Sequence, residues 1–116
     1  MKKFTVRRSK WRRGGPHYSE KNKGTTFLLN EEGYMCCLGF ACNQICRIPM
    51  EKLLNNSYPW EVANSNTTFV DSEGNSPDFV KKAVNINDNE KISNKVREAR
   101  LTKLFADNGI KVTFKD

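Results

Sequence analysis

The most regular pattern of apolar positions lies in residues 35–46, a stretch that also contains all four cysteines. The spacing i, i+3, i+4, i+7, which is typical of one face of a helix, is filled by Leu38, Ala41, Cys42 and Ile45. The pattern therefore predicts a buried helix over residues 38–46. Gly39 lies inside it, although glycine costs about 1 kcal/mol relative to alanine in a helix interior. Either another element approaches closely at this glycine, or the helix begins only after it.

A β-hairpin is predicted directly before this helix. Residues 25–29 have the composition of a strand, residues 30–33 form a polar turn, and residues 34–36 form a short return strand. Gly33 supplies the positive φ that a tight turn needs. The hairpin and the cysteine-rich helix together form one expected unit over residues 25–46.

Two terminal strands are predicted from alternation with a period of two residues. Residues 3–8 alternate weakly, whereas residues 110–114 alternate cleanly between apolar and polar side chains. Between them, Pro49 ends the cysteine-rich helix, because the residue before a proline disfavours helical backbone. Residues 49–54 then have the composition of one or two further helical turns.

A short helix is predicted to begin the C-terminal part of the chain. Ser76 is expected as its N-cap and Pro77 as its first helical residue, followed by an acidic residue in the first turn. The helix is expected to end near Asn85, where the apolar pattern stops.

The longest predicted helix covers residues 88–107. Its start is indicated by Asn87 and Glu90, which resemble a capping box. Arg97 interrupts its otherwise apolar side, and Gly109 supplies the left-handed residue that ends a helix.

Together these elements predict a single α+β domain over residues 1–116. We expect a small, mostly antiparallel sheet made of the N-terminal strand, the hairpin and the C-terminal strand, packed with two or three helices. Its parts are a basic segment (1–24), the hairpin and cysteine-rich helix (25–46), and a helix-helix-strand region (76–116).

The positive charge of the chain is concentrated at its start. The net charge is +7, yet residues 1–24 hold nine basic residues and one acidic residue, whereas the other 92 residues hold 11 basic and 12 acidic residues. Such a concentration favours an anionic partner, since it relieves the repulsion among like charges. The candidate binding residues are Arg7, Arg8, Lys10, Trp11, Arg12, Arg13, His17 and Tyr18. Arginine and lysine neutralise phosphates, and tryptophan or tyrosine can stack on a base.

The cysteines give little support for metal or for catalysis. Their spacing, C-C-x4-C-x3-C, lacks the C-x2-C pairs of structural zinc sites, so no metal and no cofactor is expected. A cysteine nucleophile needs a base, and His17 is the only histidine. Buried, reduced thiols are the favoured interpretation, and an enzyme using Cys36 or Cys37, or a zinc-stabilised interaction module, remains the alternative.

The chain also resembles a family of small bacteriophage-encoded proteins with a Cys-Cys-Leu-Gly signature. The resemblance lies in residues 35–42, preceded by Leu28-Leu29-Asn30-x-x-Gly33 and by Trp11-x-Arg13-Gly14, and followed by Asn87-Asp88 and by the pattern from Arg97 to Phe114. It implies a phage source and carries no catalytic residue over to this chain.

The expected function is that of a non-enzymatic phage accessory protein. It would bind a host component through its basic N-terminal surface and so inhibit host defence or another host process. The expected partner is a nucleic acid, a nucleotide or an acidic protein face. No stretch of about 18 apolar residues that could span a membrane is present, and no apolar segment follows the basic N-terminus as in a secretory signal. The expected location is therefore the cytoplasm, that of the host cell for a phage protein.

Overall fold

The computed structural model describes residues 2–14, 26–62, 68–71 and 73–116. The elements follow the order β1 (Lys2–Arg7), η1 (Arg8–Lys10), α1 (Cys37–Gln44), α2 (Met50–Leu53), η2 (Pro59–Glu61), α3 (Asp78–Asp88), α4 (Asn94–Ala106) and β2 (Ile110–Lys115). The mixture of helices and strands confirms the α+β class. None of the helices in these ranges is long and apolar enough to cross a membrane.

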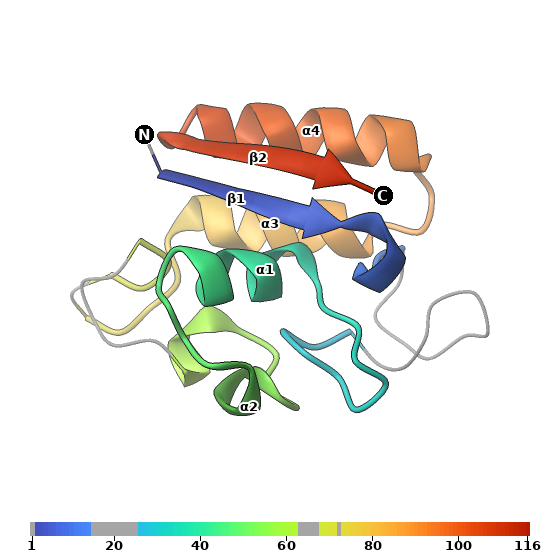
Figure 1. Cartoon of the computed structure of the whole chain (residues 1–116). Coiled ribbons are helices and arrows are strands. Elements are labelled where there is room, and N and C mark those ends of the chain that lie inside the picture. Colours follow the sequence, from blue (N-terminus) through green and yellow to red (C-terminus); the bar gives the residue numbers. More distant parts are fainter. Residues whose placement is uncertain (1, 15–25, 63–67, 72) are drawn as a thin grey trace.

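The sheet differs from the predicted one, because its two strands are parallel. β1 and β2 pair directly, with Lys2 opposite Ile110 at one end and Arg7 opposite Lys115 at the other. In Figure 1 both arrows point the same way, and the helices lie between them along the chain. The prediction of a mostly antiparallel sheet is therefore wrong: the terminal strands are joined by a long crossover through the helices rather than by a tight turn.

The predicted hairpin is wrong as a strand pair, although its turn is present. Gly33 has φ +86°, and the amide of Asn30 donates to the carbonyl oxygen of Tyr34 at 2.8 Å. The two arms then bridge other segments: Leu29 pairs with Leu54, and Met35 pairs with Trp11. The arms also share a second backbone hydrogen bond, from the amide of Cys36 to the carbonyl oxygen of Phe27 at 3.1 Å, but the described residues form no β-ladder between them. Residue 25 lies outside the described residues.

The cysteine-rich helix is confirmed as α1, and its glycine marks a close approach. The helix begins at Cys37, before Gly39, so the second alternative for this residue does not apply. A β-carbon built on Gly39 would lie 1.9 Å from the carbonyl oxygen of Leu28. Only glycine leaves room for the backbone of the preceding segment at this point.

The ends of the last two helices differ from the prediction. Helix α3 has Pro77 as N-cap and continues to Asp88, and the hydroxyl of Ser76 is buried without a hydrogen-bond partner in the described structure. Helix α4 starts at Asn94, capped by Ser93, whose hydroxyl accepts from the amide of Val96 at 3.2 Å. The predicted capping box of Asn87 and Glu90 is wrong, because Asn87 belongs to α3 and is turned into the core.

Arg97, the interruption on the apolar side of α4, is 2% exposed. Its guanidinium donates to three carbonyl oxygens of the α3–α4 connection and to the side chain of Asn94; the carbonyls are those of Ile86, Asn89 and Ile92. The buried arginine thus supplies donors to the carbonyl oxygens at the end of α3 and in the connection that follows it, where regular helical hydrogen bonding stops.

The core lies on one side of the sheet. The inward side chains of β1 and β2 pack against α4, where the rings of Phe4 and Phe105 meet edge to face at 5.1 Å. Figure 1 shows the two strands passing in front of α3 and α4, with α1 along the free edge of β1. The other face of the sheet therefore carries the outward side chains of both terminal strands.

Candidate anion-binding surface

Trp11, predicted to stack on a ligand, is a core side chain. It is 3% exposed, and its ring centroid lies 5.0 Å from that of Phe114. Its indole Nε1 donates to Oδ1 of Asn87 at 2.7 Å. The indole face is therefore occupied inside the protein and offers no platform for a base.

Asn87 holds the basic segment to the helices. Its Oδ1 also accepts from the amide of Cys37 at 3.1 Å, and its Nδ2 donates to the carbonyl oxygen of Arg12 at 3.0 Å. One buried amide thus joins the residues after β1, the start of α1 and the end of α3. Sequence reasoning missed this role because asparagine near a helix boundary usually indicates a cap.

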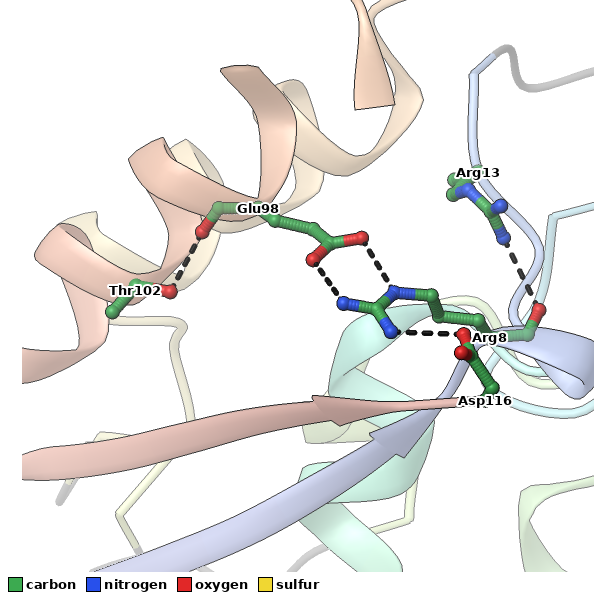
Figure 2. A network of polar contacts seen from close by, with 5 residues as sticks. All are labelled: Arg8, Arg13, Glu98, Thr102 and Asp116. Carbon is green, nitrogen blue, oxygen red and sulfur yellow. Dashed lines mark hydrogen bonds and ion pairs between the residues drawn. The ribbon is translucent and has the colours of Figure 1, made fainter. Parts of the chain in front are cut away.

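The guanidinium of Arg8 is also bound by carboxylates within the protein. Figure 2 shows its guanidinium between two carboxylates: it donates to both oxygens of Glu98 at 2.9 and 2.8 Å, and to Oδ1 of Asp116 at 2.9 Å. The hydrogen bonds to Glu98, followed by those to Asp116, raise the pKa of Arg8 above its usual value. These contacts join the end of β1 to α4 and to Asp116. Because two carboxylates already neutralise the guanidinium, Arg8 would attract an external anion only weakly.

Arg12 and Arg13 are withdrawn from solvent as well. Arg12 is 0% exposed, and the Arg13 guanidinium lies 4.6 Å from the centre of the Trp11 ring, a cation–π distance. Arg13 donates to the carbonyl oxygens of Arg8 and Trp11 at 3.3 and 3.1 Å. Desolvation lowers the pKa of both arginines, against the attraction of Asp88 for Arg12 and of Glu98 for Arg13.

Of the predicted binding residues, Arg7 and Lys10 are exposed. Lys10 lies with its Nζ 5.4 Å from the centre of the Tyr34 ring. His17 and Tyr18 lie outside the described residues. The eight predicted residues therefore do not form one common surface among those the structure describes, and most of the arginines hold the fold together.

The outward face of the sheet brings other basic residues together. Lys3 lies opposite Lys111 and Arg7 lies opposite Lys115, with a threonine pair, Thr5 and Thr113, between them. All four basic residues are exposed, and none of them forms an ion pair with a described residue. Like charges directly opposite each other in a sheet are destabilising. A bound anion would reduce the electrostatic repulsion between these pairs.

A hollow of about 440 Å³ lies on this face. Its lining consists of Lys3, Phe4, Thr5, Gln44, Lys111, Thr113 and Lys115, with no carboxylate among them. Gln44 closes one side: its side-chain amide accepts from the Thr5 amide and donates to the Thr5 carbonyl, both at 2.8 Å. The side chain takes the place of a neighbouring strand and holds the edge of β1 in position.

The sequence analysis predicted only part of this basic cluster. Lys3 and Arg7 belong to the basic N-terminal segment, whereas Lys111 and Lys115 come from the other end of the chain. The alternation of residues 110–114 contained the signal, because its polar positions are lysine and threonine. Only the parallel pairing of the two strands shows that these positions share a face with Lys3 and Arg7.

The cysteines offer no nucleophile ready for attack. Cys36, Cys37 and Cys42 are buried, and Cys46 is half-buried. Desolvation raises the pKa of Cys36 to about 12 and also raises the pKa of Cys37, whereas the pKa of Cys42 is raised first by a hydrogen bond with Cys46. Within the described ranges, no group of three or more histidine, cysteine, aspartate or glutamate side chains is placed to hold a metal ion.

Alkylation of the native protein with N-ethylmaleimide at pH 8 is expected to label Cys46 first, but more slowly than in denatured protein, because Cys46 is half-buried and hydrogen-bonded to Cys42. The other three thiols are protonated and shielded, and the thiolate is the reactive form. Mass spectrometry of timed samples measures the number and position of the labels, and denatured protein provides the fully labelled control. Rapid labelling of Cys36 or Cys37 in the folded protein would support the alternative hypothesis, an enzyme that uses one of these cysteines.

Comparison of the chain with protein-family models, curated proteins and solved structures finds no match. What the protein does must therefore be inferred from its own surface. Among the described residues, the basic face of the sheet gathers four exposed basic side chains that form no ion pair.

Proposed function

We propose that the protein is a non-enzymatic phage accessory protein that binds host nucleic acid through the basic face of its sheet. The main supporting observation is the double pairing of like charges, Lys3 with Lys111 and Arg7 with Lys115. Three of these residues line the hollow, and no carboxylate is among its described lining residues. The resemblance to small phage proteins in residues 35–42 supports the phage source, and the host cytoplasm is the corresponding location.

The dimensions of the face suit a phosphate backbone. Lys3 and Arg7 are four residues apart, which is about 13 Å at roughly 3.3 Å per residue, and the neighbouring strand lies about 4.8 Å away. Duplex DNA carries one charge per roughly 1.7 Å of its axis. Four cations over this length therefore meet several phosphates at once, and the hydroxyls of Thr5 and Thr113 can donate to phosphate or sugar oxygens.

The face favours binding without sequence preference. Base reading needs groups that reach base edges or aromatic rings on which bases stack. Trp11 is buried, and the described residues that line the hollow include one aromatic side chain, Phe4, which is 3% exposed. Contacts to the backbone, dominated by charge, are what this surface offers.

Fluorescence anisotropy with a labelled duplex DNA of mixed sequence, measured over a series of salt concentrations, tests the proposal. With four phosphate contacts, the logarithm of the association constant is expected to fall with the logarithm of the salt concentration with a slope of about −3 to −4. The double variant Lys111→Glu/Lys115→Glu is expected to lose at least half of this slope. The matched control, Lys81→Glu/Lys82→Glu, changes the net charge equally on exposed positions of α3 and is expected to retain most of the slope.

Two results would contradict the proposal. Equal losses in the two double variants would show that net charge, rather than the sheet face, drives binding. Salt-dependent binding of poly-glutamate, without binding of DNA at the same ionic strength, would assign the face to an acidic protein partner instead.

A further inference from the structure

A second pocket, of about 270 Å³, lies away from the basic face, where the start of α1 meets the end of α3. Its walls are largely apolar and include Phe27, Cys36, Cys37, Leu38 and Val84. An apolar cavity of roughly 150 Å³ is large enough to hold benzene. This pocket therefore has room for one ring that carries a polar substituent.

The polar group that distinguishes this pocket is the carboxylate of Asp88. Its Oδ1 accepts from Nδ2 of Asn87 at 3.0 Å, whereas its Oδ2 has no hydrogen-bond partner among the described residues. No described cation lies within ion-pair distance of it. The pKa of Asp88 is raised by desolvation, against the hydrogen bond from Asn87 and the charges of Arg12 and Arg97. An acceptor atom thus remains available at the edge of an apolar pocket.

We propose that this pocket binds a small planar ring compound that presents an amidinium or guanidinium group to Asp88. The ring would pack between Leu38 and Val84, which line the pocket with Phe27. The cationic group would donate to Oδ2 and to the remaining lone pair of Oδ1, the two-pronged geometry in which planar N–H donors meet a carboxylate. The site has the features of a ligand pocket, namely a concave, mostly apolar wall with a few polar groups, of which Asp88 is the carboxylate; the others belong to Thr26, Ser57, Tyr58 and Asn87.

This selectivity is opposite to that of the sheet face. The basic face requires an anion, whereas the pocket offers a carboxylate and would reject one by charge repulsion. The two proposals therefore rest on different residues and can fail separately.

A titration of ¹⁵N-labelled protein with benzamidine, benzamide and benzoate tests the pocket. The three probes share one ring and carry a cationic, a neutral and an anionic substituent. Benzamidine is expected to shift the amide resonances of residues around the pocket, including Leu38 and Tyr58, in a saturable way. Benzamide is expected to bind more weakly, and benzoate is expected to leave these resonances unchanged. Benzoate binding as strong as that of benzamidine would overturn the proposal.

Variants then assign the binding to the two parts of the site. Asp88→Asn is expected to weaken benzamidine binding by about ten- to a hundredfold, the loss typical of a hydrogen bond to a charged group. The matched control Asp78→Asn, at an exposed position of the same helix, is expected to leave it unchanged.

Val84→Phe fills the apolar part of the pocket while it keeps the carboxylate, and it decides the question if the Asp88 variant does not fold. A Val84→Phe protein with an intact spectrum is expected to lose benzamidine binding, and retained binding would overturn the proposal. Lys111→Glu/Lys115→Glu is expected to bind benzamidine as the original chain does, which separates this test from that of the sheet face.

Discussion

Replacing Asn87 with alanine is expected to lower the free energy of unfolding by about 3–5 kcal/mol. The substitution leaves four polar groups without their partner: the indole Nε1 of Trp11, the amide of Cys37, the carbonyl oxygen of Arg12 and Oδ1 of Asp88. Each buried group that loses its hydrogen bond costs roughly 1–3 kcal/mol. A domain of this kind has only about 5–15 kcal/mol in total, so the loss is a large fraction of its stability.

Urea unfolding, followed by circular dichroism and by Trp fluorescence, measures this effect. Asn85→Ala is the matched control, because Asn85 lies in the same helix and is exposed, and it is expected to change stability by no more than about 0.5 kcal/mol. Trp60 is 43% exposed and Trp11 is 3% exposed, so a change in native fluorescence of the Asn87 variant reports the environment of Trp11. Similar stabilities of the two variants would contradict the role assigned to Asn87.

Replacing Gly39 with alanine is expected to cost about 2 kcal/mol net, although alanine is the better helix former. The new β-carbon would lie 1.9 Å from the carbonyl oxygen and 2.8 Å from the carbonyl carbon of Leu28. These are backbone atoms, so the overlap can be relieved only by moving α1 away from the segment before it. Overpacking of this kind typically costs about 1–3 kcal/mol, and it outweighs the gain of about 1 kcal/mol in helix propensity.

Gly109→Ala separates this steric effect from backbone strain. Gly109 has φ +76°, and a β-carbon there would meet no atom within 4 Å. Its substitution is expected to cost roughly 1–2 kcal/mol, the penalty for a left-handed backbone conformation. Thermal and urea unfolding of both variants provide the comparison, and a Gly39 variant that is as stable as the original chain would contradict the close approach of Leu28.

The arginines of the N-terminal segment and the basic residues of the sheet have different tasks. Arg8 joins β1 to Glu98 in α4 and to Asp116, and Arg13 covers the indole of Trp11. These contacts fix the segment that follows β1 against the helices. Because β1 is fixed in this way and paired with β2, the outward residues of both strands are held at defined positions, which is what a charged binding face requires.

The sequence by itself determined the local elements. The helix spacing of residues 38–46, the alternation of residues 110–114 and the glycine at position 109 each depend on neighbours within a few residues, and the structure contains the corresponding α1, β2 and helix stop. Helix boundaries were less accurate, since Asn87 serves a distant tryptophan rather than the backbone next to it. A local sequence pattern cannot show a hydrogen-bond partner that lies far away in the sequence.

Only the tertiary structure decided how the strands pair and which charges are available. The parallel pairing of β1 with β2 joins residues more than a hundred positions apart in the sequence, and it alone places Lys111 and Lys115 beside Lys3 and Arg7. In the same way, Arg8 and Arg12 carry charges that the sequence displays, but carboxylates and burial withdraw them from solvent. The strength of a charge at a surface depends on what lies within a few ångströms of it, and that is a property of the fold rather than of the chain.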